Sequence, residues 1–242
     1  MGITSFWKDI LFPARCARCR RIIAEGAVCE KCYLEIEPYN FLRCGECRAR
    51  LPSTALAKEG LPADRVDSAC HPKWPFILGA ATNYKDESAQ SLIKALKFEG
   101  ISDAAKPLAE LIFQFTGTLP LDIFENSILV PIPLRPARLR ERGYNQSELI
   151  ANILGEKMNL PIKKHILIRT KLTKPQSEAR SHEEREINVS NCFSLKNPAE
   201  ISGRKIVLID DVITSGHTLY QAAQTLRAGG AGKIIALTVA MA

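Results

Sequence analysis

The chain contains no run of about eighteen consecutive apolar residues, the length that a transmembrane helix needs. Its N-terminus also has no basic segment ahead of an apolar core, which argues against a secretory signal peptide. Cysteine is almost missing after Cys70, where only Cys192 follows. These absences lead us to expect a cytoplasmic protein without membrane insertion. Its 242 residues suffice for one domain plus a small module.

A strong charge of either sign is also lacking. The formal net charge of +7 is modest for 242 residues, and zinc-bound thiolates would lower it further. Binding of nucleic acid is permitted by this balance but is not required by it.

The crowded N-terminal cysteines favour metal over disulfides, because no secretion signal precedes them. Two residues separate Cys16 from Cys19, and two residues separate Cys29 from Cys32 after a nine-residue spacer. Two such pairs supply the four thiolates that structural zinc prefers. The sequence therefore predicts one closed zinc site, with no open position for catalysis.

A second metal site is less complete. Cys44 and Cys47 form another pair and Cys70 follows, so a fourth ligand must come from elsewhere. We favour Asp67, whose spacing from Cys70 reproduces a knuckle, over His71, because adjacent Cys70 and His71 cannot easily face one ion. A degenerate site without metal stays open, as does the pairing of Cys16 and Cys19 with Cys44 and Cys47.

Residues 206–219 carry the clearest functional pattern: an apolar strand, two acids, a loop of small hydroxyl residues and glycine, then an amphipathic helix. A helix start offers free backbone N–H groups and a partial positive charge to a phosphate. The loop residues expected to line this phosphate site are Thr214, Ser215, Gly216, His217 and Thr218.

The paired acids Asp210 and Asp211 would repel that phosphate. They suit instead the vicinal hydroxyls of a ribose, or a Mg²⁺ ion. Phosphate at one end and a diol at the other predict a ribose 5-phosphate. Paired acids also end strands in receiver-type and NTPase folds, but those folds do not require the loop that follows here.

A second anion site is expected after the strand at 127–132, where Arg135, Arg138 and Arg142 precede a helix that begins near Asn145. Guanidinium groups form the paired hydrogen bonds that pyrophosphate accepts. A basic surface turn is the alternative. The polar segment 171–188 is too long for a simple connection between two elements, and its length is typical of a lid.

Further strands are expected at 77–84, 165–170 and 233–240, and helices at 86–98 and around 108–115. Alternating strands and helices predict a parallel α/β sheet, whose ligands bind beyond the carboxyl ends of the strands. Cys192 is expected to be a buried apolar position in the returning strand.

The stretch 206–219 resembles the phosphoribosyl pyrophosphate (PRPP) motif of type I phosphoribosyltransferases. The whole chain resembles the ComF family, most specifically at Arg142-Gly143-Tyr144-Asn145-Gln146. This resemblance implies a small zinc-ribbon module over 1–75 and a type I phosphoribosyltransferase-like, Rossmann-like α/β domain over 76–242. It also implies that the lid contributes Arg169, Gln176 and Arg185.

The ComF resemblance implies binding of PRPP with Mg²⁺ and one or two structural zinc ions. It also implies uptake of single-stranded DNA during bacterial natural transformation, beside a competence helicase. Two alternatives stay open: a metabolic phosphoribosyltransferase with an unidentified acceptor, and a non-enzymatic DNA-binding adaptor. The sequence leaves turnover and oligomeric state undecided.

Overall fold

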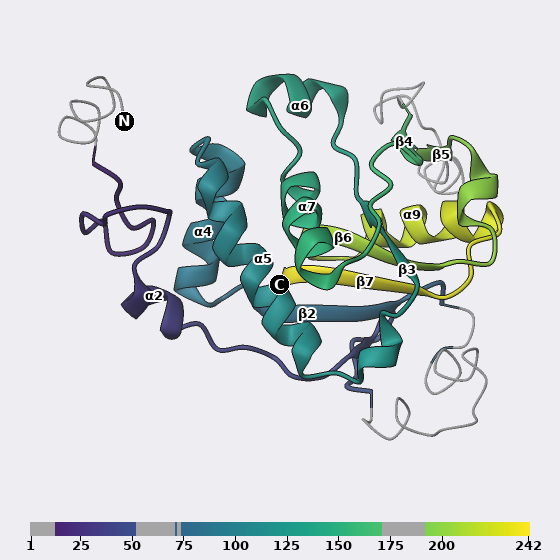
Figure 1. The fold of residues 1–242 in the computed structure, drawn as a ribbon, viewed down its shortest axis with the longest axis horizontal. Coiled ribbons are helices and arrows are strands. Elements are labelled where there is room, and N and C mark those ends of the chain that lie inside the picture. The colour runs from purple at the N-terminus through teal and green to yellow at the C-terminus, as the bar shows by residue number, and fades with distance from the viewer. Residues whose placement is uncertain (1–12, 52–70, 72–73, 171–191) are drawn as a thin grey trace, which may run out of the picture.

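The fold is built on a five-stranded sheet in the order β1-β2-β7-β6-β3 (Figure 1). The computed structural model describes residues 13–51, 71, 74–170 and 192–242. The strands are β1 (Arg43–Cys44), β2 (Ile77–Asn83), β3 (Ser127–Pro131), β6 (Lys205–Ile213) and β7 (Ile234–Met241). Strands β2, β7, β6 and β3 are parallel, and β1 is antiparallel to β2. The predicted parallel α/β sheet is confirmed, with one antiparallel edge strand from the N-terminal segment.

The central strands are buried on both faces, as their apolar and β-branched residues predict. In the register of the sheet, Val207 of β6 lies between Leu129 of β3 and Ile235 of β7. Alternate residues divide the core: Val207 packs on one face and Leu208 on the other.

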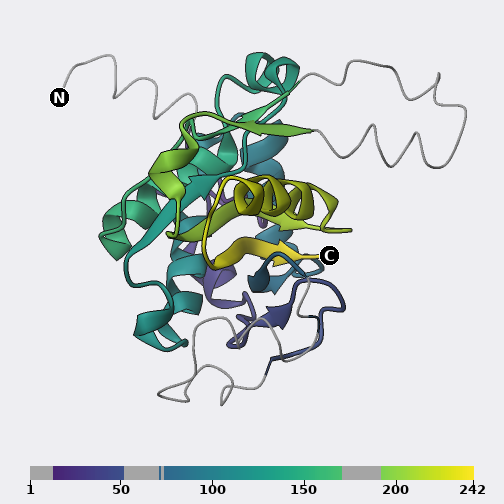
Figure 2. The ribbon, with the colours of Figure 1, turned by 90° about the vertical axis from the view of Figure 1, so that its right-hand side faces the viewer.

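Helices cover both faces of the sheet (Figure 2). On one face lie α4 (Glu87–Phe98), α5 (Ala105–Gly117) and α7 (Gln146–Met158), packed on the residues that share the Val207 side. On the other face lies α9 (His217–Ala228), packed on the Leu208 side. The predicted start of α7 is confirmed, because the Asn145 side chain accepts a hydrogen bond from Ser147 N at 3.1 Å.

The N-terminal segment packs onto this sheet rather than standing apart. It contains the short helix α2 (Glu30–Leu34) and β1. Its residues Ile36, Leu42 and Leu51 belong to the same buried cluster as α4, α5 and α7. Backbone bonds tie the segment to β2, as in Tyr39 N to Ala81 O at 2.7 Å. Residues on both sides of the expected domain boundary at residue 75 therefore share one hydrophobic core.

Two sequence expectations need correction. The predicted strand at 165–170 is β4 (Leu167–Arg169), which pairs antiparallel with β5 (Phe193–Leu195) in a separate ribbon and does not join the central sheet. The arginine segment, expected as a pyrophosphate-binding loop or a basic surface turn, instead forms the helix α6 (Pro136–Arg142), ended by Gly143 at φ +78°. Three short 3₁₀ helices complete the described elements: η2 (Ser102–Ala104), η3 (Leu121–Ile123) and η5 (Pro198–Ile201). None of the helices within the described ranges has the length and apolarity to cross a membrane.

Candidate functional site

The paired acids lie within the last residues of β6, which continues to Ile213. The sequence pattern places the end of the strand at the two acids, which was wrong, because Val212 and Ile213 also pair with β7. Helices α4 and α7, on the same face of the sheet, each supply one partner to these acids. The two carboxylates therefore have different surroundings.

Asp211 is the more buried acid, with 3% of its surface exposed. Its Oδ1 lies 2.6 Å from Nζ of Lys97, the penultimate residue of α4. Its Oδ2 is buried and accepts no hydrogen bond from any residue that the structure describes. A buried charged oxygen without a donor is costly, so this atom is suited to a donor brought by a ligand.

Asp210 is half-buried and accepts two hydrogen bonds on Oδ1, from Ser147 Oγ at 3.0 Å and from the Asp211 backbone N at 2.9 Å. Burial, together with the negative charge of Asp211, raises the pKa of Asp210 to about 7. The two hydrogen bonds and Lys97 act in the opposite direction but do not cancel this rise.

This raised pKa predicts how stability depends on pH. At pH values between the ordinary aspartate pKa and about 7, Asp210 keeps a proton in the folded chain that it has lost in the unfolded chain. The contribution of Asp210 to the free energy of unfolding therefore falls as pH rises through that window. We expect Asp210→Asn to raise the melting temperature at pH 8 and to change it less at pH 5. Thermal unfolding at both pH values measures this, with the exposed Asp103→Asn as control. An equal shift of the melting temperature at both pH values would contradict the raised pKa of Asp210.

The loop after β6 leads directly into α9. Thr214, Ser215 and His217 are exposed, Thr218 is half-buried, and Gly216 is the N-cap with φ +82°. Because glycine has no capping side chain, α9 begins without a side-chain cap. His217 N donates a long hydrogen bond of 3.4 Å to Ser215 Oγ, and the N–H groups that follow in the first turn are suited to an anion.

The arginines in and just before α6 have different surroundings. Arg138 pairs with Glu141 at 2.8 Å, and Arg142 donates to Gln146 Oε1 at 3.1 Å. Arg135 instead lines a pocket of about 350 Å³, whose lining residues are Arg135, Pro136, Ala137, Arg140, Arg169, Thr170 and Cys192. Cys192 is half-buried at this pocket, so the expectation that it is a buried core position was wrong.

The arginine-lined pocket is suited to an anion. Burial and the neighbouring charge of Arg135 lower the pKa of Arg169, whose Nη1 donates to Pro133 O at 3.4 Å. One pocket thus contains both Arg135, expected at the pyrophosphate site, and Arg169, expected in the lid. The other expected lid residues, Gln176 and Arg185, lie outside the described residues.

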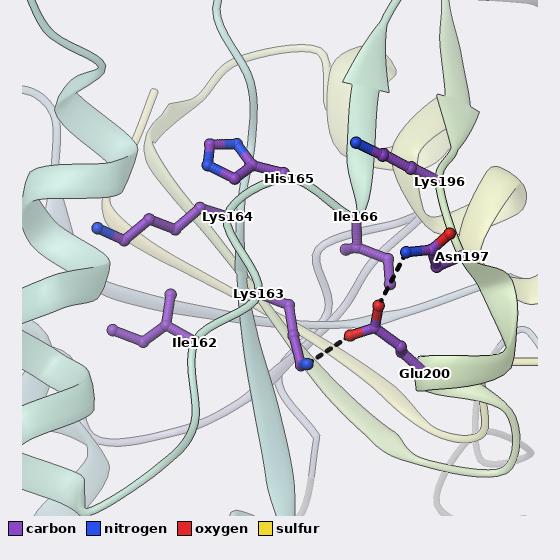
Figure 3. A pocket seen from close by; sticks show the side chains of 8 residues that line it. All are labelled: Ile162, Lys163, Lys164, His165, Ile166, Lys196, Asn197 and Glu200. Atoms are coloured by element: carbon purple, nitrogen blue, oxygen red, sulfur yellow. Dashed lines mark hydrogen bonds and ion pairs between the residues drawn. The ribbon is translucent and has the colours of Figure 1, made fainter.

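A second basic pocket, also of about 350 Å³, lies away from the paired acids, beside η5 (Figure 3). In it Glu200 bonds both Lys163 and Asn197, while Lys164 pairs with Glu148 at 3.2 Å. These lysines already have partners, and the pocket is not continuous with the acids of β6.

The first cysteine group has the geometry of a zinc site. The sulfur atoms of Cys16, Cys19, Cys29 and Cys32 lie within 4.8 Å of one another, and Cys19 Sγ is 3.8 Å from Cys29 Sγ. Tetrahedral zinc with bonds of about 2.3 Å separates its sulfur ligands by about 3.8 Å. The alternative pairing with Cys44 and Cys47 is not the one that the structure brings together.

The second group unites Cys44, Cys47 and His71 within 4.8 Å. His71 Nδ1 lies 3.3 Å from Cys44 Sγ, and its Nε2 lies 3.7 Å from Glu46. A carboxylate behind the distal nitrogen is the usual support of a metal-bound histidine. His71, ranked behind Asp67 in the sequence, is therefore a candidate ligand, while Asp67 and Cys70 lie outside the described residues.

Comparison with known proteins agrees with this architecture. A phosphoribosyl transferase domain model matches residues 145–242, and a double zinc ribbon domain model matches residues 7–66. Competence protein F of Haemophilus influenzae is 29% identical over 230 residues, covering 92% of this chain and 95% of that protein. The chain is similar to competence protein F over nearly the whole length of both proteins. The predicted resemblance to the ComF family and the predicted fold class are confirmed.

Further relatives extend this homology. DNA utilization protein YhgH of Escherichia coli K12 is 29% identical over 234 residues, covering 92% of this chain and 94% of that protein. Competence protein ComFC of Bacillus subtilis is 39% identical over 100 residues, covering 41% of this chain and 38% of that protein. The double zinc ribbon match, together with both ligand clusters, supports structural zinc in this chain.

Two residues near the site were not selected from the sequence. Lys97 lies in the helix expected at 86–98, and it pairs with Asp211. Arg140 lies between the selected arginines Arg138 and Arg142, and it lines the pocket with Arg135. For Arg140 the arginine cluster was already a usable signal, whereas nothing local distinguishes Lys97 from Lys94.

Proposed function

We propose that this ComF homologue binds PRPP or a related ribose 5-phosphate ligand and acts in the uptake of single-stranded DNA during natural transformation. The observation that carries the proposal is Asp211, five residues before the N-cap of α9: its buried Oδ2 accepts no hydrogen bond from any described residue, and the N-cap Gly216 has no side chain to cap the helix. A carboxylate acceptor beside a phosphate-binding helix start matches the two ends of a ribose 5-phosphate.

In this proposal the ribose lies over the end of β6. Its 5-phosphate accepts hydrogen bonds from the N–H groups in the first turn of α9 and from the hydroxyls of Thr214, Ser215 and Thr218. Its vicinal hydroxyls donate to Asp211 Oδ2, the atom that lacks a donor among the described residues. The Lys97 bond occupies only the other oxygen, so the ion pair does not saturate the acid.

The arginine-lined pocket would hold the pyrophosphate of PRPP. Arg135, Arg140 and Arg169 bring three guanidinium groups to it, and none of the described residues that line it carries a carboxylate. Mg²⁺ would neutralise pyrophosphate charge, and the carboxylates of Asp210 and Asp211 are the hard oxygen donors that it prefers. Positive charge in this pocket would also stabilise a departing pyrophosphate.

The biological role rests on the relatives, whose names refer to competence and to DNA utilization. A metabolic phosphoribosyltransferase with an unidentified acceptor is the second candidate, favoured by the phosphoribosyl transferase domain match. Release of pyrophosphate from PRPP with a panel of nucleobases, measured beside single-stranded DNA binding across salt concentrations, separates the two.

The binding step is tested by calorimetry with PRPP and Mg²⁺. Thr218→Val removes one hydroxyl from the first turn of α9, so we expect an affinity loss of about tenfold, the worth of one hydrogen bond to a charged group. The matched control is Thr225→Val on the same helix, where the hydroxyl donates to Gln221 O at 2.8 Å and does not face the loop.

We expect the Thr225→Val chain to bind PRPP like the unaltered chain. If the unaltered chain shows no heat and no thermal shift at saturating PRPP, the proposed ligand is wrong. Equal losses in the two threonine variants would contradict the location of the phosphate.

A further inference from the structure

The second zinc knuckle places a guanidinium group against the phosphate loop. Arg48, directly after Cys47, lies so close to Gly216 that a Cβ added there would be 2.4 Å from Arg48 Nη2. Gly216 is the N-cap of α9, so the guanidinium sits at the positive end of that helix. A residue of the zinc ribbon thus reaches the proposed sugar-phosphate site.

The position of Arg48 is fixed by the knuckle. Its backbone N donates to Cys44 O at 3.1 Å, and its carbonyl accepts from Arg43 Nη1 at 3.0 Å. The knuckle itself is held near α9 by Trp74, whose ring lies 4.6 Å from that of Tyr220. Gly45 permits this packing, since a Cβ there would meet Trp74 at 2.4 Å.

This arrangement lacks its negative partner. A guanidinium beside a helix N-terminus is unfavourable by itself, because two positive ends face each other. Nη1 of Arg48 is buried, yet it donates to no acceptor among the residues that the structure describes. Asp211 Oδ2, five residues before Gly216, is likewise buried and accepts from none of the described residues. An anionic group that also carries hydroxyls would satisfy both atoms.

We infer that Arg48 is a ligand-binding residue of the sugar-phosphate site, where its guanidinium donates to the 5-phosphate held by the loop 214–218. The inference rests on the proposed function and extends it. The zinc ribbon then completes the site instead of only flanking it. Because Cys44 and Cys47 position Arg48, metal binding at this knuckle and phosphate binding favour each other.

The test compares Arg48→Met with Arg50→Met in the full chain. Methionine keeps an unbranched apolar stem at both positions, and Arg50 is exposed, with its guanidinium 4.3 Å over the Phe41 ring. Affinity for ribose 5-phosphate is measured by calorimetry, with magnesium pyrophosphate as a second ligand and zinc content determined on the same samples.

We expect Arg48→Met to weaken ribose 5-phosphate binding at least tenfold, with unchanged pyrophosphate binding and zinc content, and Arg50→Met to change neither affinity. Unchanged ribose 5-phosphate binding by Arg48→Met overturns this inference and leaves the proposed function intact. Equal loss of both ligands also overturns it, because Arg48 would then be structural. Failure of the unaltered chain to bind ribose 5-phosphate or PRPP overturns both.

Discussion

Replacing Cys16 or Cys32 with serine is expected to remove one zinc ion per chain and to unfold the segment around the first cysteine group. Both side chains are buried, and the segment around them holds only a few local backbone bonds, such as Cys16 N to Arg21 O at 2.9 Å. Structural zinc in such small modules contributes on the order of 10–16 kcal/mol, far more than local contacts could replace. Zinc analysis and hydrogen exchange over residues 13–36 measure the loss.

Cys192→Ser is the matched control, because Cys192 lies outside both ligand clusters. It should retain the zinc of the unaltered chain, which we expect to be near two ions. Cys47→Ser should remove only the second ion, held with Cys44 and His71. Full zinc retention by Cys16→Ser would show that the first cluster is not a metal site.

Lys97→Met is expected to lower the free energy of unfolding by about 3 kcal/mol at pH 7.5, because it leaves the Asp211 carboxylate buried without its cation. The two charged atoms lie 2.6 Å apart, and the Asp211 side chain is 5% exposed. Urea unfolding measures the change. Lys94→Met on the same helix is the control, since Lys94 is exposed and donates to Gln90; we expect a change below about 0.5 kcal/mol.

A double-mutant cycle makes the cause specific. Adding Asp211→Asn to Lys97→Met removes the stranded charge and should recover most of the lost stability. If the double variant were less stable than Lys97→Met alone, the ion pair would not be the reason for the loss.

Local patterns were sufficient for much of this chain. The helix start at Asn145, the strand-loop-helix unit around Gly216 and the first zinc site each depend on residues close together in the sequence. Spacing and capping chemistry act over only a few residues, so sequence alone reveals them. The phosphoribosyl transferase domain match and the mostly parallel sheet confirm the fold that these patterns predicted.

Contacts between distant segments could not be predicted in the same way. Lys97 resembles any other lysine of an amphipathic helix until α4 packs beside β6 and leaves it next to Asp211. Arg169 and Arg135 share a pocket because β4 leaves the central sheet and pairs with β5. No spacing rule encodes either meeting.

The sequence by itself determined the paired cysteines of the N-terminal segment and the strand-loop-helix unit around Gly216, and it predicted zinc for the first and a phosphate for the second, because short-range patterns of residue type define both. Only the tertiary structure decided that β1 joins the sheet, that Asp211 keeps one oxygen without a donor among the described residues, and that Arg48 meets Gly216. The physical reason is that burial and charge pairing depend on which surfaces pack together, and packing is a property of the whole fold.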